Sequence, residues 1–403
     1  MNALGSRIPL AVPNYGTREV DAIVDVLRSG NVTQGEKVAA FEQRFLEEVG
    51  APTTTRAAMV NSGSSANLLA AALWAHLAEL RGDVRREVIM PALTWSTTVA
   101  PFVQHGFKPV FVDVGDDYCV DPAAVRDAVT DQTIGIVAVH LLGNPCNMEA
   151  LTHLARANFL LLHEDCCEAL GSHWGGKQVG CFGDTASYSF YLSHHITTIE
   201  GGMLLWPAPY EEVLAMREHG WVRKYGATRR DEIAGHNPTL HPTWTFDQLG
   251  YNVRATELQA AMGLVQLDRH AAWRKARVGH AHTLDERLRA HHYHLWPRVL
   301  SAEAIPNPFN YPIRVRPDAP FSRDDLVNYL EAAGVETRPV MTGNITRHPW
   351  YRRHPDAYRV AGSLTNTDAI HDNAFLLPCA PHLTSQDVER VADTIDIFLE
   401  AYP

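Results

Sequence analysis

The sequence predicts an α/β protein in which a large, mostly parallel sheet precedes a smaller α+β domain. Short segments that are apolar at nearly every position recur through the first half of the chain, and helical patterns separate several of them. Strands of a parallel sheet have this continuous apolar character because helices cover both of its faces. A long helical pattern then precedes loops rich in proline and asparagine, short strands and a final helix, which indicates a second domain.

The first predicted element is an amphipathic helix over residues 16–29, in which Val20, Ile23, Val24 and Leu27 share one face. Strands should follow, each recognised as an apolar run of strand length. Their predicted ranges are 57–60, 87–93, 108–114, 134–143, 158–165, 185–191 and 201–206.

Helical patterns complete the order of elements. The segment SSANLLAAALWAHLAEL predicts a helix that starts near Ser64 or Ser65. A pattern over 258–288 is long enough to bridge two domains, and residues 385–402 predict a terminal helix. We therefore expect a large α/β domain over residues 1–264 and a small C-terminal domain over residues 265–403.

Composition and charge narrow the possible functions. The 403-residue chain is 46% hydrophobic and 20% charged, as is ordinary for a folded soluble protein. Its net charge of −11 argues against nucleic acid or an anionic membrane as a partner. Because the protein is acidic overall, it would have to bind phosphates through local groups such as the amides of helix N-termini. No apolar run reaches membrane-spanning length, and residues 1–13 lack the features of a signal peptide, so we expect a cytoplasmic protein.

No metal site is expected from the cysteines or histidines. The cysteine spacings match no zinc or iron–sulfur pattern, so we predict free thiols. The histidines grouped between residues 280 and 294 look metal-like, but solvated side chains on a polar helix and its exit are the favoured interpretation.

Short polar motifs at the ends of predicted strands raise the possibility of a cofactor site. In VNSGSSANLL, a strand ends at Val60, and the helix start at Gly63, Ser64 and Ser65 could bind a phosphate. Taken alone, Ser64 as a simple N-cap is the favoured interpretation. In PALTWSTTV, Trp95 could stack on a planar ring, although a core tryptophan would be the ordinary assignment.

Carboxylates follow the apolar segment NFLLLHED at the end where open α/β sheets bind ligands. A buried Asp165 needs a cationic partner, and a pyridinium nitrogen is one; helix capping is the alternative. In SFYLSHHITTIEGG, Ser189 ends a strand, and His194 and His195 occupy a tight turn. A phosphate cradle, a stacking ring, a carboxylate and a residue that acts on the cofactor, in this order, predict a pyridoxal 5′-phosphate (PLP) site.

Several segments also resemble a known family. They are SGSSANL, PALTWSTTV, PVFVDV, HLLGNPCNM, EDCCEALGS, GCFGDTASYSFY, LGYNVRATELQAA and TGNITRHPW. Together they resemble the DegT/DnrJ/EryC/StrS type of sugar aminotransferases and dehydratases, which have the aspartate aminotransferase fold (PLP fold type I). The similarity is greatest to the GDP-4-keto-6-deoxymannose 3-dehydratase branch, in which histidine replaces the PLP lysine within an SFYPxHH motif. Here Leu192 stands in place of the proline.

The resemblance implies roles for individual residues. His194 would be the catalytic base in the lysine's position, with His195 as a structural hydrogen-bonding companion. Asn252 would reach the phosphate of a neighbouring subunit, which implies a homodimer with shared sites. The remaining implied cofactor contacts are Gly63, Ser64, Ser65 and Ser189 for the phosphate, Trp95 for stacking, Asp165 for the pyridine nitrogen and Glu168 near the ring hydroxyl.

The implied activity is removal of the C3 hydroxyl from a 4-keto-6-deoxy sugar nucleotide, with pyridoxamine phosphate (PMP) as the working cofactor and glutamate as the amino donor. An iron–sulfur cluster is not expected, because residues 219–246 contain no cysteine. Alternatives remain: a keto-sugar aminotransferase, or an inactive relative that only binds PMP or a nucleotide sugar. Lys177 should be exposed, whereas an approach of Lys224 to the site stays open.

Overall fold

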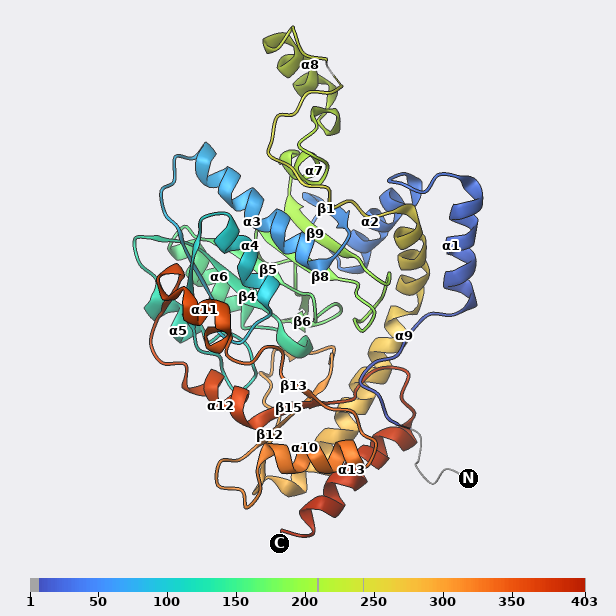
Figure 1. Cartoon of the computed structure of the whole chain (residues 1–403), viewed down its shortest axis with the longest axis vertical. Coiled ribbons are helices and arrows are strands. Elements are labelled where there is room, and N and C mark those ends of the chain that lie inside the picture. Colours follow the sequence, from blue (N-terminus) through green and yellow to red (C-terminus); the bar gives the residue numbers. More distant parts are fainter. Residues whose placement is uncertain (1–6, 209, 242, 403) are drawn as a thin grey trace.

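A computed structural model describes residues 7–402 apart from 209 and 242, and its centre is an eight-stranded sheet (Figure 1). The strand order is β1-β9-β8-β5-β4-β2-β3-β14. Neighbours from β8 to β14 run parallel, whereas β9 is antiparallel to both β8 and β1. The strands are β1 (Thr55–Val60), β2 (Glu87–Pro91), β3 (Lys108–Val112), β4 (Thr133–Val139), β5 (Leu161–Asp165), β8 (Thr185–Ser189), β9 (Gly202–Pro207) and β14 (Arg359–Val360). The predicted α/β class and mostly parallel sheet are confirmed.

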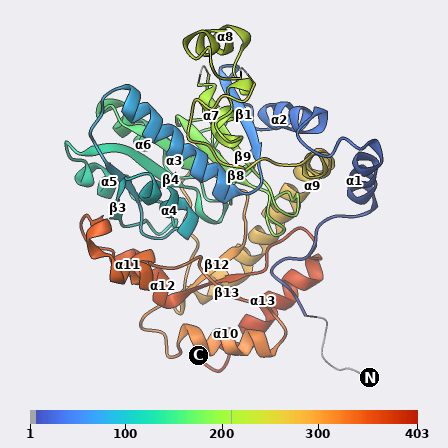
Figure 2. The same cartoon turned by 45° about the horizontal axis from the view of Figure 1, so that its top comes forward.

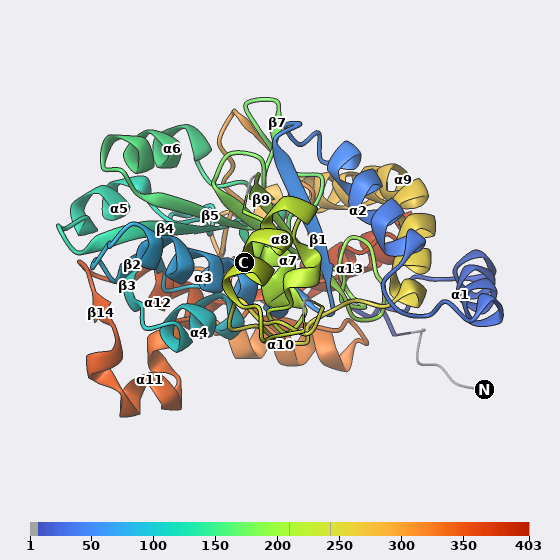
Figure 3. The same ribbon diagram turned by 90° about the horizontal axis from the view of Figure 1, so that it is seen from above.

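Helices cover both faces of this sheet, which explains why its strands are apolar throughout. Helices α3 (Gly63–Leu80) and α4 (Ser96–Gln104) lie on one face. Helices α5 (Pro122–Ala128) and α6 (Met148–Ala157) lie on the other (Figure 3). Buried apolar clusters fill the space on each side and include Trp74 of α3 and Phe102 of α4.

The long helix α9 (Glu257–Leu288) runs from the large sheet to the C-terminal part of the chain, as predicted. Helices α1 (Thr17–Ser29) and α2 (Glu36–Glu48) pack beside it. The predicted helix α1 is confirmed, but its apolar face is only partly covered within this chain: Ile23 and Val24 are half-buried, whereas Val20 is 46% and Leu27 54% exposed. The side that faces α9 instead carries Glu19, whose carboxylate accepts hydrogen bonds from Gln266 and Arg269.

The C-terminal part contains a four-stranded antiparallel sheet in the order β10-β12-β15-β13. Its strands are β10 (Leu295–Trp296), β12 (Tyr311–Val315), β13 (Arg338–Pro339) and β15 (Ala374–Leu377). Helices α10 (Arg323–Ala332) and α13 (Ser385–Leu399) pack with this sheet around a common apolar core. The predicted boundary at residue 264 falls inside α9, and β14 returns to pair with β3 of the large sheet. The division into two domains therefore stays a prediction.

The remaining elements are short. Strands β6 (His173–Trp174), β7 (Lys177–Gln178) and β11 (Ala304–Ile305) form a small sheet. Helix α7 (Glu212–Arg217) packs against α3, whereas α8 (Ala227–His236) projects beyond it at the top of the view (Figure 2). Helices α11 (Pro349–Arg353) and α12 (Thr365–Asn373) lie beside the large sheet. Single 3-10 turns occupy Leu141–Gly143, Val222–Lys224, Arg289–His291, Ile345–Arg347 and Pro355–Ala357.

Two expectations about location concern the whole chain. Among the described helices, none combines the length and hydrophobicity needed to cross a membrane. The predicted absence of a signal peptide rests on residues 1–13, of which the first six lie outside the described residues. That expectation and the cytoplasmic location stay predictions.

Candidate active site

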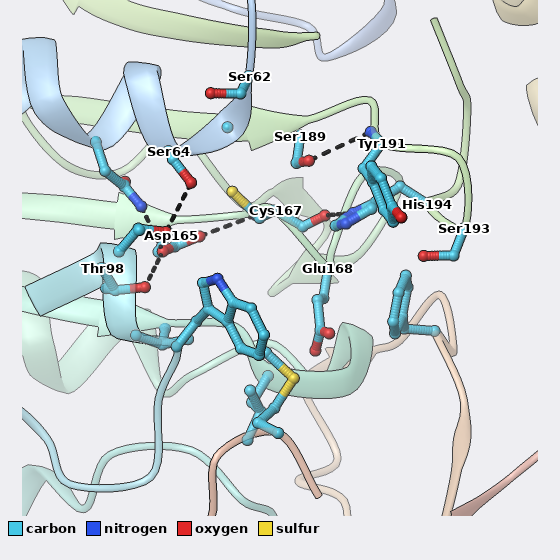
Figure 4. Close-up of a pocket in the computed structure, with 18 of the residues that line it drawn as sticks. Ser62, Ser64, Thr98, Asp165, Cys167, Glu168, Ser189, Tyr191, Ser193 and His194 are labelled. Carbon is cyan, nitrogen blue, oxygen red and sulfur yellow. Dashed lines mark hydrogen bonds between the residues drawn. The ribbon is translucent and has the colours of Figure 1, made fainter. Parts of the chain in front are cut away.

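A cavity of about 320 Å³, here called the front cavity, opens at the carboxyl ends of the central strands (Figure 4). Ligands of open α/β sheets bind at this edge. Asp165 at the end of β5 and Ser189 at the end of β8 form part of its wall, and Arg338 and Met341 contribute from the C-terminal part. Of the predicted site residues, those that line it are Gly63, Ser64, Trp95, Asp165, Glu168, Ser189 and His194.

The N-terminus of α3 forms one end of the cavity. The N-cap is Ser62, whose side chain accepts a hydrogen bond from the Ser65 amide at 3.1 Å, so the N-cap interpretation of Ser64 is wrong. Ser64 is free for another contact, and its hydroxyl lies 2.7 Å from that of Thr97. A Cβ on Gly63 would lie 2.6 Å from the Cβ of Ser189, so only glycine allows this approach of helix to strand. The open amides of such a helix start favour an anion.

Two predicted cofactor residues lie elsewhere. The Ser65 hydroxyl donates to Asn61 Oδ1 at 2.6 Å and does not line the front cavity. Asn252 is exposed, and its side-chain oxygen accepts a hydrogen bond from Arg254. Its predicted role toward a neighbouring subunit therefore stays a prediction.

Asp165 is a buried carboxylate held by neutral donors. Its Oδ2 accepts hydrogen bonds from Thr98 Oγ1 at 2.7 Å and Asn67 Nδ2 at 3.1 Å, and Oδ1 accepts from the Cys167 amide at 3.1 Å (Figure 4). The helix-capping alternative is wrong, because the residues directly after Asp165 form turns and not a helix. A carboxylate offers about four acceptor positions, so Oδ1 keeps one for a cationic N–H in the cavity.

The sequence analysis missed Asn67 and Thr98, although both stand inside motifs that it quoted. Asn67 is buried in α3, and its Oδ1 pairs with His163 Nε2 at 3.0 Å. Thr98 is buried in the first turn of α4. A polar residue among the apolar positions of a helix that packs on a sheet was the available signal, because buried polar groups require partners.

Trp95 is the N-cap residue of α4 and lies at the cavity wall. Its side chain is 49% exposed, so the interpretation as a core tryptophan is wrong. A half-exposed indole at a cavity wall offers an open face for stacking on a planar ligand.

The geometry of His194 fixes which of its nitrogens can act as a base. Nδ1 lies 2.6 Å from the Cys167 carbonyl oxygen (Figure 4). Because a carbonyl oxygen only accepts, Nδ1 carries the proton and Nε2 keeps its lone pair in the neutral ring. The Phe309 ring packs at 5.0 Å between centroids. Desolvation, supported by the charge of Arg277, lowers the pKa of His194 to about 4, so the ring is an unprotonated base near neutrality.

His195 has a structural environment. Its Nε2 donates to the Asn307 carbonyl at 2.9 Å, and the side chain is buried. Burial lowers the pKa of His195 well below its ordinary value, which keeps the ring neutral. This agrees with the expected role of a hydrogen-bonding companion that orients the turn.

The lysines of the chain, Lys37, Lys108, Lys177, Lys224 and Lys275, all belong to the described part, and none of them lines the front cavity. Lys177 is exposed, as predicted. The question left open for Lys224 has an answer within this chain: its amine lies 2.8 Å from Glu218 Oε1, outside the cavity. Among the described residues that line the cavity, Arg338 alone is a lysine or arginine.

Glu168 adds a second carboxyl group to the cavity wall. Its Oε2 accepts a hydrogen bond from the Leu142 amide at 2.9 Å. Desolvation raises the pKa of Glu168 to about 7, so near neutrality this carboxyl can exchange a proton.

Behind Asp165 lies a buried group of His140, Glu164 and Cys166, whose possible ligand atoms all fall within 4.8 Å of one another. The His140 and Glu164 side chains already have protein partners. His140 Nδ1 accepts from the Cys146 amide, and Glu164 accepts from His140 and the amides of Gly180, Phe182 and Gly183. This network joins the ends of β4 and β5 and needs no ion to satisfy it. All six cysteines are free, as predicted.

Comparison with known proteins assigns the chain to a family. A family model described as the DegT/DnrJ/EryC1/StrS aminotransferase family matches residues 13–396. The chain belongs to this family. Its members are PLP-dependent enzymes that modify sugars. The resemblance recognised in the sequence is therefore confirmed, together with the aspartate aminotransferase type of fold.

Relatives within the DegT/DnrJ/EryC1/StrS family include dehydratases. The chain is 36% identical to a dTDP-4-dehydro-2,6-dideoxy-D-glucose 3-dehydratase of Saccharopolyspora spinosa, over 94% of this chain and 83% of that protein. It is 32% identical to a GDP-4-keto-6-deoxy-D-mannose 3-dehydratase of Yersinia pseudotuberculosis, over 94% and 95%. A solved structure of the E. coli GDP-4-keto-6-deoxy-D-mannose-3-dehydratase with bound hydrated PLP superposes with a TM-score of 0.86, at 30% identity and covering 97% of this chain and 100% of that one.

The front cavity fits the cofactor of this family. Its closed end is a helix N-terminus without a Cβ at Gly63, which suits a phosphate. The partners that the structure gives the buried Asp165 side chain are neutral, which leaves its charge to be balanced by a ligand such as a pyridinium ring.

Proposed function

We propose that this chain is a PLP/PMP-dependent 3-dehydratase, a lyase that removes the C3 hydroxyl of a 4-keto-6-deoxy sugar nucleotide during deoxysugar biosynthesis. The observation that carries the proposal is the combination of a PLP-type cavity with a histidine base and, among the described lining residues, no lysine. A lysine would hold the cofactor covalently and would take part in transamination. Histidine retains only the proton-transfer role.

Each residue of the front cavity has a task in this scheme. Gly63, Ser64 and Ser189 would bind the phosphate, Trp95 would cover one ring face, and Asp165 Oδ1 would hold the proton of the ring nitrogen. When bound, the aminated cofactor supplies an amine for the sugar C4 ketone and a conjugated ring that accommodates the electrons released when a proton leaves its C4′ carbon.

His194 would accept that proton at Nε2, because the Cys167 carbonyl engages Nδ1. The Phe309 ring limits the access of water to the base. Glu168, with its pKa raised to about 7, would lie near the ring hydroxyl of the cofactor and could exchange a proton there. Over the complete reaction the sugar loses one oxygen atom, ammonia is released, and glutamate would restore the amine.

The anionic substrate requires a positive group, and Arg338 at the cavity wall would supply it. Among the described residues, Arg338 has no ion-pair partner, so its guanidinium is available for a phosphate or a carboxylate. Relatives named as GDP- and dTDP-sugar 3-dehydratases support a sugar nucleotide as substrate.

A homodimer with shared sites belongs to the same proposal. The exposed apolar face of α1, with Val20 and Leu27, is suited to contact a second copy. Asn252 lies outside the front cavity of its own chain, so its phosphate contact would be made in the partner's cavity. We also infer a cytoplasmic location from the composition.

A product assay tests the reaction. Purified protein is incubated with PLP, glutamate and a panel of GDP-, dTDP-, CDP- and UDP-linked 4-keto-6-deoxy sugars, and the products are measured by mass spectrometry. We expect a 4-keto product that has lost one oxygen atom, with release of ammonia. A product that keeps the C3 hydroxyl and gains an amine at C4 would identify an aminotransferase instead. Binding of a substrate with no product would identify the inactive alternative.

The cofactor linkage gives an independent check. Borohydride treatment followed by peptide mass spectrometry should find no pyridoxyl group on any lysine, because the structure keeps Lys224 and the other lysines away from the front cavity. A modified Lys224 would contradict the assignment of His194.

A further inference from the structure

A second cavity of about 690 Å³, here called the back cavity, lies between α9 and the small sheet of β6, β7 and β11. None of its lining residues lines the front cavity. Its wall contains polar groups that are buried but lack partners, which is costly unless a ligand satisfies them.

His270 and Gln178 are the buried polar groups in question. His270 is 3% exposed, and its Nδ1 lies 2.8 Å from Glu48 Oε1. This hydrogen bond holds the pKa of Glu48 below its usual range, so Glu48 is a carboxylate and Nδ1 donates to it. His270 Nε2 then remains without a partner beside the lining residue Gly171. Gln178 is 8% exposed, and its side-chain nitrogen also has no partner.

Two cationic side chains that have no ion-pair partner in the described part of the chain line the same cavity. Arg274 and Lys275 are consecutive residues of α9 that line the back cavity, and the Nε of Arg274 is buried without a partner. The two carboxylates that line the cavity already have partners: Glu48 accepts a hydrogen bond from His270, and Asp285 forms an ion pair with Arg298. The lining thus carries three cations, Arg274, Lys275 and Arg298, against these two carboxylates. The cavity therefore has an excess of positive charge.

We propose that the back cavity binds a phosphate-bearing small molecule. The Arg274 and Lys275 side chains would contact phosphate oxygens, which accept more hydrogen bonds than a carboxylate does. The Gln178 amide would donate a further hydrogen bond. His270 Nε2 would pair with a hydroxyl, either of the phosphate itself or of the group attached to it. The volume exceeds that of the front cavity, which leaves room for a phosphate monoester.

The back cavity lies close to the turn that carries His194 and His195. Pro306 and Pro308 line the back cavity, and the next residue, Phe309, lines the front cavity and packs against His194 and His195. Between the prolines, Asn307 accepts the hydrogen bond from His195. A single short segment thus separates the two cavities.

The test measures binding of inorganic phosphate and of glucose 1-phosphate to the cofactor-loaded protein by equilibrium dialysis, with the loaded cofactor subtracted. We expect one site per chain, weakened about tenfold or more in a variant that combines Arg274→Ala with Lys275→Ala, since charge-assisted contacts are lost. Arg56→Ala, which removes a charge at an exposed position that lines neither cavity, should bind like the wild type. Gln178→Glu, which adds a carboxylate to the wall, should also lose binding, and it serves if the double variant does not fold.

Tighter binding of glucose 1-phosphate than of inorganic phosphate would identify a phosphate monoester as the occupant, and equal affinities would identify free phosphate. Binding that survives the double variant and Gln178→Glu but is lost in Arg338→Ala would place the anion in the front cavity and overturn the proposal. Absence of any site in the wild type would overturn it as well. Since these readouts do not depend on turnover, a failed dehydratase assay leaves them unaffected.

Discussion

His194 owes its proposed role to one hydrogen bond. The Cys167 carbonyl accepts from Nδ1 and leaves Nε2 as the only basic atom of the neutral ring. Two residues after Asp165, Cys167 also supplies an amide to that carboxylate. The same short segment therefore positions the acidic and the basic side chains of the front cavity.

Replacing His194 with Asn should leave cofactor affinity nearly unchanged, because the phosphate, stacking and Asp165 contacts come from other residues. The rate of dehydration should fall about 10²–10⁴-fold, the usual contribution of a positioned base. Absorbance titration measures the affinity, and product formation measures the rate. A variant that dehydrates at the wild-type rate would exclude His194 as the base and direct attention to His195.

Replacing His194 with Lys should bring an amine to the same turn and create a covalent link to PLP. We expect visible absorbance that borohydride abolishes, and a pyridoxyl group at residue 194 in peptide mass spectra. Formation of the 3-deoxy product should drop. If PLP stays unlinked in this variant, the turn does not present its side chain as aminotransferases present their lysine.

Glu168 should make stability depend on pH. Its pKa is raised from 4.5 to about 7 by desolvation, so its contribution to stability is complete below about pH 4.5 and is lost as pH rises through 7. Relative to Glu168→Gln, the cofactor-free wild type should lose on the order of 3 kcal/mol between pH 4.5 and pH 8. Urea unfolding of both proteins at the two pH values measures this difference. A difference that does not change with pH would show that Glu168 titrates normally.

At the scale of elements, the approach of α3 to β8 determines the shape of the phosphate end. Gly63→Ala would place a Cβ 2.6 Å from that of Ser189 and 3.0 Å from Cys167 Sγ, so helix and strand must separate. We expect lower cofactor affinity and a lower melting temperature. Gly279→Ala is the matched control: it lies within α9 with nothing near its Cβ, and it should stabilise the protein by about 0.5–1 kcal/mol. Equal behaviour of the two variants would contradict the close approach.

The sequence predicted the strands and the order of elements well, because continuous apolar runs such as 185–191 and 201–206 report burial on both faces directly. Residues whose role depends on a contact between distant parts of the sequence were harder to predict. The start of α3 was placed one or two residues late, since a run of serines offers several equivalent N-caps and only packing against Ser189 selects Ser62. Asn67 and Thr98 were missed because they meet Asp165 only once two helices pack on the sheet.

At the scale of the whole molecule, α1 is another element whose neighbours in space the sequence does not reveal. Its periodicity predicted the helix, but Val20 and Leu27 of the apolar face stay exposed in the single chain. A sequence pattern indicates that a face is apolar and cannot distinguish between its own core and a second copy.

Complementation tests the proposed shared sites. Asn252→Ala and His194→Asn homodimers should both be impaired. In a mixture after subunit exchange, each heterodimer would contain one front cavity with both residues intact, so about one quarter of the wild-type activity should return when half of the dimers are mixed. Sedimentation analysis confirms the dimer. If activity does not recover although the subunits exchange, Asn252 acts within its own chain or not at all.

The two helices at the front cavity have one more consequence. Helix α3 presents Gly63 to the phosphate end and, one turn later, Asn67 to Asp165. Helix α4 carries Trp95 at the cavity wall and, in its first turn, Thr98, which donates to the same carboxylate. One helical turn is about 5.4 Å long and does not stretch. The distance between the phosphate end of the cavity and Asp165 is therefore fixed. A cofactor analogue with one more carbon between its ring and its phosphate would reach either the phosphate contacts or Asp165, but not both.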